Sequence, residues 1–358
     1  MSWRDHIRIP LRSMSAYHVP PETFDVKLDA NESPWPLTPE LEHVIALATA
    51  NQALHRYPDA GARELKAALA THAGVPISSL VIGNGSDEII AMLCAAFGNA
   101  DVRGPARVMF SSPGFVMYSI SSVSFGLRPV EVPLGPGYAA DPDALVAAIE
   151  REQPSVVFLA TPNNPTGTVW PRAAIERVLA AATDSVVVID EAYLAYSGEP
   201  SCVDLALKPG NERCVVMQTL SKIGLAGLRV GYLVGQGEMV RELEKVRPPY
   251  NLDTLAQAAA TAVLRHGAEA LAQHAKSVRA ERARLAEALA ARPDYVVYDS
   301  GANFVLVRVP SATALSAQLR QASIAVRAYD RGLLADCVRI TVGTPAENDR
   351  LLAALATL

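Results

Sequence analysis

The sequence QTLSKIGLAGLR at residues 218–229 places one lysine, Lys222, between an apolar strand and a loop of small residues. The hydroxyls of Thr219 and Ser221 precede it, and Arg229 follows on the loop. A lysine at the end of a buried strand can lose its proton and attack a carbonyl. Hydroxyls and an arginine are the groups that bind a phosphate ester. The stretch therefore predicts a pyridoxal phosphate site, although an exposed loop lysine is an alternative that it leaves open.

Polar side chains also follow two other apolar strands. The segment FLATPNNPTG at 158–167 carries Asn164 in a turn, and VVVIDEAY at 186–193 ends on Asp190, with Tyr193 close behind. In an open α/β sheet, ligands bind beyond the carboxyl ends of the strands. We therefore expect these three side chains and the lysine in one crevice.

Each of the three matches one need of a pyridoxal ring. The carboxylate of Asp190 can keep the pyridine nitrogen protonated, so that the ring accepts electrons from the substrate. Tyr193 and Asn164 can both donate hydrogen bonds to the ring's phenolate oxygen. Taken singly, they could be a strand-capping aspartate, a core tyrosine and a turn asparagine. Their occurrence together and in this order favours the cofactor site.

A glycine-rich turn, GNGSDE at 83–88, precedes an apolar helical pattern over 89–97. Glycines permit a tight turn, and the free amides at a helix N-terminus bind anions. The turn predicts that the amides of Ser86 and Asp87 bind the cofactor phosphate, joined by the hydroxyls and the arginine of the lysine stretch. An ordinary N-cap is the alternative for the turn alone.

Together these motifs resemble the class I and II aminotransferases of pyridoxal-phosphate fold type I. The matching segments are NPTG at 164–167, DEAY at 190–193 and Ser221-Lys222 with Arg229. The chain is most similar to the branch of this family that acts on histidinol phosphate, and the resemblance runs from about residue 28 to the C-terminus. The segments that carry it are LDANESP at 28–34, RYP at 56–58, GNGSDE at 83–88 and VRITVGT at 338–344.

The resemblance implies a ping-pong transamination in which Lys222 carries pyridoxal phosphate and moves a proton between substrate and cofactor. It implies that Phe115 stacks on the pyridine ring, where many relatives have tyrosine. It also implies a homodimer with shared active sites, in which Tyr57 reaches the cofactor phosphate of the other subunit. The spacing from Lys222 to Arg229 is one residue shorter than in some relatives, which leaves the reach of the arginine open.

The implied substrates carry different anions. Histidinol phosphate has a phosphate and no carboxylate, whereas 2-oxoglutarate and glutamate have carboxylates and no phosphate. An arginine fork binds either anion through two hydrogen bonds, which makes Arg339 and Arg327 the candidates. Structural salt bridges are the alternative for both. Tyr17, Asn31 and Glu32 are expected to close over the substrate from the N-terminal segment.

Other activities remain open at this point. Part of the resemblance is shared with phosphothreonine decarboxylases and aromatic amino-acid aminotransferases. A catalytically silent relative that only binds cofactor or protein is a third possibility. Against it, Lys222, Asp190 and Arg229 are all present, and a silent relative has no chemical need for them.

Short apolar strands alternate with helical patterns through the middle of the chain, which predicts βαβ units and a mostly parallel sheet. The expected strands are 108–111, 128–132, 156–160, 186–190, 215–219 and 230–234, with further strands at 304–309 and 338–342. Helices are expected over 39–51, 62–73 and 253–292, the last interrupted at Gly267. The resemblance implies an α/β chain: an arm over 1–30, a large domain with a seven-stranded type of sheet over 31–250, and a smaller α+β domain over 251–358. The first helix is the element that could pack with the smaller domain.

Composition is that of a globular enzyme. The 358 residues are 50% hydrophobic and carry a net charge of −5, which gives no reason to expect nucleic acid or an anionic membrane as partner. The charged start of the chain and the lack of a long apolar span predict a cytoplasmic protein. The four cysteines are scattered without metal-ligand spacing, so we expect reduced, mostly buried thiols and no metal site.

Overall fold

The apolar runs of the middle of the chain form strands where their patterns predict them. In the computed structural model, which describes residues 2–12, 14, 22–100, 102 and 104–357, these strands belong to one seven-stranded sheet. Two of the parallel strands, at 156–160 and 186–190, are buried along their whole length, as expected for parallel strands covered by helices. The strands are β2 (Leu80–Asn84), β3 (Arg107–Ser112), β4 (Arg128–Pro133), β5 (Val156–Ala160), β6 (Val186–Asp190), β7 (Cys214–Thr219) and β8 (Val230–Val234).

The strand order of this larger sheet is β2-β8-β7-β6-β5-β3-β4. The five strands from β7 to β4 run parallel, whereas β8 is antiparallel to β7 and β2 is antiparallel to β8. The mostly parallel sheet is thus confirmed. In register, Ala160 faces Asp190 and Asp190 faces Met217, so the carboxyl ends of β5, β6 and β7 meet at one edge.

Helices cover both faces of the larger sheet and bury a separate hydrophobic cluster on each. On one face lie α4 (Ser86–Ala96), α5 (Val116–Ser124) and α9 (Gly237–Glu244). On the other lie α3 (Arg63–Ala73), α6 (Pro142–Glu152), α7 (Arg172–Ala181), α8 (Val203–Leu207) and α10 (Thr254–His266). Because each face is closed by helices, the polar strand ends are left at the edges of the sheet, where a ligand can reach them.

A smaller, five-stranded sheet has the order β1-β11-β12-β10-β9 and is antiparallel except between β1 and β11. With the helices packed on it, it encloses a third hydrophobic cluster. Its elements are β1 (Val26–Leu28), β9 (Val296–Tyr298), β10 (Phe304–Arg308), β11 (Ile324–Tyr329), β12 (Cys337–Thr341), α12 (Ala312–Gln321) and α13 (Pro345–Ala356). The strand β1 lies within the residues expected to form the arm, so both ends of the chain contribute to this sheet.

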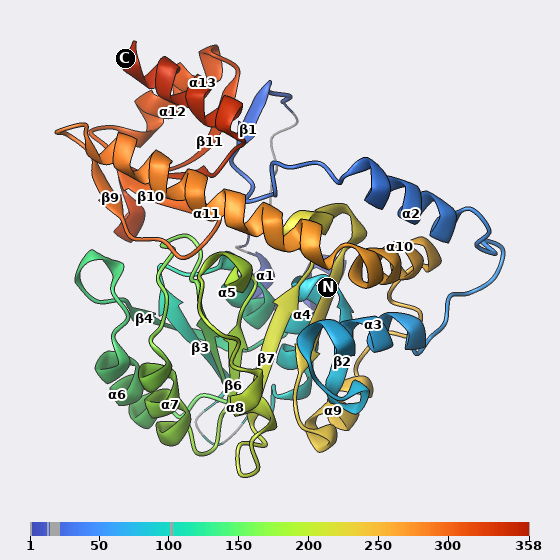
Figure 1. Ribbon diagram of the computed structural model, residues 1–358. Helices are drawn as coiled ribbons and strands as arrows, with labels where there is room; N and C mark the ends of the chain where they lie inside the picture. Colours follow the sequence, from blue (N-terminus) through green and yellow to red (C-terminus); the bar gives the residue numbers. More distant parts are fainter. Residues whose placement is uncertain (1, 13, 15–21, 101, 103, 358) are drawn as a thin grey trace.

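The long helix α11 (Ala268–Ala290) connects the two parts, running from α10 along their junction to the smaller sheet (Figure 1). The break at Gly267 is where the sequence predicts it, and a β-carbon there would lie 2.8 Å from the Val263 carbonyl oxygen. The predicted first helix, α2 (Pro39–Thr49), packs against α10. Short helical elements complete the described chain: α1 (Ile9–Arg12) and the turns Trp3–His6, Ile77–Ser79, Pro136–Tyr138, Leu194–Tyr196, Ser221–Leu225, Ala226–Leu228 and Gly332–Leu334.

All four cysteines are free and buried, as predicted. Within the described ranges, no helix is both long and apolar enough to cross a membrane.

Candidate active site

A cavity of about 500 Å³ lies at the carboxyl ends of β5, β6 and β7, between the two sheets. Most side chains that the sequence singles out line it, although they come from distant parts of the chain. They are Asn31, Ser86, Asp87, Phe115, Asn164, Asp190, Tyr193, Ser221, Lys222, Arg229, Arg327 and Arg339.

Lys222 lies just beyond the end of β7, in a kinked turn that begins at Ser221. The kink is at Gly224, which has a φ of 106° and so adopts a conformation that side chains disfavour. Tyr196 donates a hydrogen bond to the carbonyl oxygen of Lys222 and so holds the backbone of the turn in place. The Lys222 Nζ lies 5.8 Å from the centre of the Tyr193 ring, within the cavity.

Asp190 is the last residue of β6 and is only 5% exposed. Its Oδ1 accepts a hydrogen bond from the Ala192 amide at 3.0 Å, and its Oδ2 accepts one from the Tyr118 hydroxyl. Burial raises the pKa of Asp190 to about 6, although the Tyr118 hydrogen bond opposes this rise. Among the described residues, no lysine, arginine or histidine forms an ion pair with this carboxylate. A cationic group in the cavity would therefore find an uncompensated buried charge.

The first turn of α4 forms one end of the cavity and has the features of an anion site. Its N-cap, Gly85, has no side chain to satisfy the amides of this turn, and Ser86 and Asp87 both line the cavity, so their amides are candidates to bind an anion there. Arg229 lies beside the turn and donates to Asp87 Oδ2 at 3.2 Å and Ser221 Oγ at 3.4 Å. A β-carbon at Gly85 would lie 2.5 Å from Arg229 Nη2, so any other residue would displace the guanidinium from the turn, and the φ of Gly85, 76°, also favours glycine.

Thr219 contributes to this end of the cavity indirectly. Its hydroxyl donates to Ser221 Oγ at 3.0 Å and accepts from the Ser221 amide, but Thr219 does not itself line the cavity. Another glycine, Gly231, passes behind the turn, where a β-carbon would lie 2.6 Å from the Ser86 nitrogen. The turn is thus packed closely against β8 on one side and borders the cavity on the other.

The opposite side of the cavity is a network between the two sheets. Arg339 donates from Nη1 to Asn164 Oδ1 at 2.7 Å and from Nη2 to the Asp29 carbonyl at 2.6 Å, and it lies over the Phe304 ring. Its Nε is buried and has no partner among the described residues. Because Arg339 occupies the oxygen of Asn164, the NH₂ of this amide is the group left to donate into the cavity.

Asn31 is held more firmly than a closing segment would be. It is buried, its Nδ2 donates to the Tyr193 hydroxyl at 3.0 Å, and Thr341 and Asn303 bond its backbone. The sequence predicts this residue as a substrate contact, and the structure adds that it positions Tyr193.

Three other predicted residues lie away from the cavity or outside the described part of the chain. Tyr57 is 81% exposed and stacks on Tyr250 with 4.6 Å between ring centres. Glu32 is half exposed and forms an ion pair with Lys27 at 3.1 Å. Tyr17 lies outside the described residues.

Among the cavity residues that the sequence analysis does not single out are Asp29, Tyr118, Tyr329 and Leu334. Of these, Tyr118 had a local signal, because it follows Phe115 by three residues at the start of a helix and so lies on the same side. Tyr329 and Leu334 reach the cavity only through the packing of the smaller sheet, for which no local signal exists.

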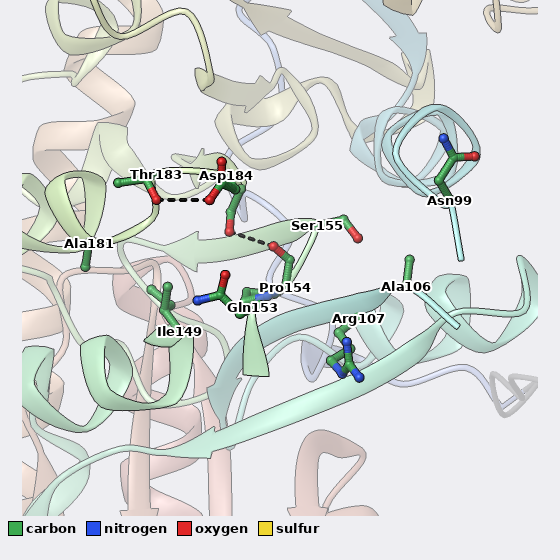
Figure 2. Close-up of a pocket in the computed structure, with 11 residues that line it drawn as sticks. Asn99, Ala106, Arg107, Ile149, Gln153, Pro154, Ser155, Ala181, Thr183 and Asp184 are labelled. Atoms are coloured by element: carbon green, nitrogen blue, oxygen red, sulfur yellow. Dashed lines mark hydrogen bonds between the residues drawn. The ribbon is translucent and has the colours of Figure 1, made fainter. Parts of the chain in front are cut away.

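A second, smaller hollow of about 180 Å³ lies at the opposite edge of the larger sheet, around Arg107 and Gln153 (Figure 2). Two of its hydroxyls already have partners, since Ser185 donates to the Pro154 carbonyl and Thr183 to Asp184. No cluster comparable to the lysine, aspartate and anion turn occurs here, so the first cavity is the candidate active site.

Comparison with known proteins gives the same picture over nearly the whole chain. The sequence pattern of the family Aminotransferase class I and II matches residues 25–355. Histidinol-phosphate aminotransferase 1 of Burkholderia lata is 45% identical over 98% of this chain and 97% of its own. Histidinol-phosphate aminotransferase of Chromobacterium violaceum is 44% identical over 98% of this chain and 96% of its own.

Among solved structures, histidinol-phosphate aminotransferase from Sinorhizobium meliloti in complex with pyridoxal-5'-phosphate superposes with a TM-score of 0.84. It is 27% identical and covers 98% of this chain and 96% of its own. The fold is therefore that of the fold type I aminotransferases, as the motifs predict. The chain belongs to the class I and II aminotransferase family.

Proposed function

We propose that this protein is a pyridoxal-phosphate-dependent transaminase that transfers the amino group of L-histidinol phosphate to 2-oxoglutarate. The products are imidazole-acetol phosphate and L-glutamate, and the reaction belongs to histidine biosynthesis. The single observation that carries the proposal is one cavity that joins a lysine, an uncompensated buried carboxylate and an anion-binding turn. The names and full-length similarity of the relatives support the choice of substrate.

The residues of the cavity fit pyridoxal phosphate. The amides of Ser86 and Asp87, the Ser221 hydroxyl and Arg229 suit a phosphate ester, because all can donate hydrogen bonds to its oxygens. Asp190 is a buried anion without a cationic partner, which is what a protonated pyridine nitrogen requires.

When bound, pyridoxal phosphate supplies an aldehyde that accepts an amino group and a ring that accepts the electrons of a broken C–H bond. Lys222 would hold the cofactor between turnovers, and its Nζ, once free, would be the group that moves a proton at the substrate α-carbon. Asp190 would hold the proton of the ring nitrogen. Tyr193 and Asn164, oriented by Asn31 and Arg339 respectively, would be the donors to the ring's phenolate oxygen.

The phosphate of one substrate and the carboxylates of the other bind in turn to arginines of the cavity. Arg339 and Arg327 lie opposite each other on the neighbouring strands β12 and β11, and both line the cavity. Arg339 is the stronger candidate for the substrate anion, because its Nε is buried and without a partner among the described residues. Its planar fork suits the phosphate of one substrate and a carboxylate of the other.

We further propose a homodimer in which Tyr57 reaches the cofactor phosphate of the second subunit. The support is an aromatic pair, Tyr57 and Tyr250, left on the surface of one subunit, with Tyr57 outside its own cavity. We also propose an arm over 1–30, a large domain over 31–250 and a small domain over 251–358. The separate hydrophobic clusters of the two sheets support two domains. Two elements cross the proposed bounds, since β1 of the arm joins the smaller sheet and α10, within 251–358, packs on the larger one. A place in the cytoplasm stays a prediction.

A competition assay tests the proposed activity. Purified protein loaded with pyridoxal phosphate is given equal amounts of histidinol phosphate, O-phosphothreonine and phenylalanine with 2-oxoglutarate, and each product is measured by mass spectrometry. We expect imidazole-acetol phosphate and glutamate to dominate. Preferential phenylpyruvate would indicate an aromatic aminotransferase, and CO₂ release from phosphothreonine would indicate a decarboxylase. Loaded protein without any product would indicate a silent relative.

A further inference from the structure

We propose that Tyr118 is a positioning residue of the reaction, whose phenol fixes the Asp190 carboxylate and stabilises its negative charge for contact with the cofactor's ring nitrogen. This inference rests on the proposed function. It concerns a residue of α5 that acts on the cofactor only through Asp190.

The geometry leaves the Tyr118 hydroxyl little freedom. The residue is 1% exposed, and its ring stacks on Phe158 with 4.4 Å between ring centres and 10° between planes. Phe110 and Phe115 contact the same ring, each with 5.6 Å between centres. From this aromatic cluster the hydroxyl reaches Asp190 Oδ2 at 2.5 Å. Because the packed ring cannot move, the Tyr118 hydroxyl stays in one place, and its hydrogen bond fixes the Asp190 carboxylate.

Tyr118 is also the side chain that offsets the charge of Asp190. The other ionisable groups that act on this carboxylate, Glu191 and Asp87, are acidic and disfavour its ionised form. Besides the phenol, the Ala192 amide is the donor to Asp190 among the described residues. Burial beside Asp190 raises the pKa of the Tyr118 phenol well above its usual range, so the phenol keeps its proton and remains a donor. A hydrogen bond to an ionised group is among the stronger ones in proteins.

Two residues at the N-terminal end of α5, Phe115 and Tyr118, bear on the cofactor site. Phe115 lines the cavity where a ring would stack, and Tyr118, one helical turn later, contacts both Phe115 and Asp190. The helix therefore couples the position of the Phe115 ring to the position of the Asp190 carboxylate.

The test follows the proton on the ring nitrogen itself. Pyridoxal phosphate labelled with ¹⁵N in the ring is bound to the wild type, to Tyr118→Phe and to Tyr232→Phe, and the ¹⁵N chemical shift is recorded between about pH 6 and 9. Tyr232 is a matched control, because it is another fully buried tyrosine of the larger sheet, on the opposite face, and its hydroxyl bonds to Gln218 instead. The readout is independent of turnover.

We expect a protonated ring nitrogen in the wild type and in Tyr232→Phe. In Tyr118→Phe the carboxylate loses its donor, so the proton moves from the ring nitrogen to Asp190 and the signal shifts toward the unprotonated value. We expect kcat to fall about 10- to 100-fold, the worth of a hydrogen bond to a charged group. In an Asp190→Asn background, Tyr118→Phe should change neither signal nor rate, because the charge it stabilises is gone.

Identical spectra for the Tyr118 and Tyr232 variants would overturn the inference, and so would an equal loss of rate in the Asp190→Asn background. Should Tyr118→Phe not fold, 3-fluorotyrosine at position 118 supplies a more acidic donor of nearly the same size. It should raise the pH at which the ring nitrogen loses its proton, and an unchanged titration would overturn the inference. A wild type that does not bind pyridoxal phosphate would instead contradict the proposed function.

Discussion

Replacing Asp190 with asparagine should stabilise the cofactor-free protein while impairing the loaded one. Burial raises the pKa of Asp190 from its ordinary value of 3.8 to about 6, so the ionised carboxylate costs folding free energy. At about 1.36 kcal/mol for each tenfold change in proton affinity, this cost is roughly 3 kcal/mol. An amide of the same shape carries no charge and can still accept the Ala192 amide hydrogen bond. Cofactor-free Asp190→Asn should therefore unfold with a free energy higher by about this amount at neutral pH.

The sign of the pH dependence follows from the direction of the shift. Because the folded protein holds the proton more tightly than the unfolded chain, the cost is absent below about pH 4, grows as pH rises and is complete above about pH 6. Urea unfolding at a series of pH values should show the variant and the wild type converging toward acid pH. Asp143→Asn, an exposed position on α6, serves as a control and should change stability by less than about 0.5 kcal/mol.

Adding pyridoxal phosphate should reverse the order of stability, so that the wild type becomes more stable than Asp190→Asn. The wild-type carboxylate then faces a cationic ring nitrogen, whereas the amide of the variant cannot hold the ring proton by charge. The wild type should gain more stability from the cofactor than the variant gains, and the variant should lose most of its turnover. A cofactor-free variant no more stable than the wild type, or a difference that does not vary with pH, would refute the reasoning.

Three further predictions concern anions and the second subunit. Arg339→Ala should weaken both half-reactions by about 2 to 5 kcal/mol, as measured by single-turnover kinetics, whereas Arg327→Ala should affect them less. Gly85→Ala should weaken cofactor affinity at least about tenfold in a fluorescence titration, because the new β-carbon would lie 2.5 Å from the guanidinium of the anion site. Tyr57→Phe mixed with Lys222→Ala should recover the activity of one native site per heterodimer, since both lesions fall in one of the two shared sites.

Each has an informative opposite result. If Arg339→Ala impairs one half-reaction only, the two substrate anions use separate groups. Gly210→Ala is the matched control for Gly85→Ala, since its φ is also positive, at 90°, and no atom lies within 4 Å of the added β-carbon. Equal losses of affinity in both glycine variants would show that the close approach of Gly85 to the Arg229 guanidinium does not matter for cofactor binding. Heterodimers that form and stay inactive would rule out the crossed arrangement.

Much of the larger sheet could be predicted because its central strands are buried on both faces and appear as continuous apolar runs. The strands β5, β6 and β8 have the predicted bounds. The edge strand β2 was missed, since its last residues, Gly83 and Asn84, belong to the glycine-rich turn. The helix α4 begins at Ser86 and not at residue 89, because its polar first turn carries no apolar period.

The carboxyl ends of parallel strands share an edge, so the meeting of Asn164, Asp190 and Lys222 follows from the strand pattern alone. The links from Asn31 to Tyr193 and from Arg339 to Asn164 do not, because they depend on how two sheets pack. The strand β1 has only three residues and pairs with a strand almost the whole chain away, which leaves no local signal for its place. Local pattern thus predicts the groups of the site, while tertiary packing decides how they are oriented.

The central claim is that the Lys222 cavity carries an amino group from histidinol phosphate to 2-oxoglutarate on pyridoxal phosphate. The most direct measurement mixes the loaded protein with histidinol phosphate alone, without a keto acid, and follows the cofactor absorbance and the product. We predict one equivalent of imidazole-acetol phosphate per site, conversion of the cofactor to its amine form, and full reversal of the spectrum on adding 2-oxoglutarate. Lys222→Ala should show none of these changes. A fully loaded wild type whose spectrum stays unchanged and that yields no product would contradict the account.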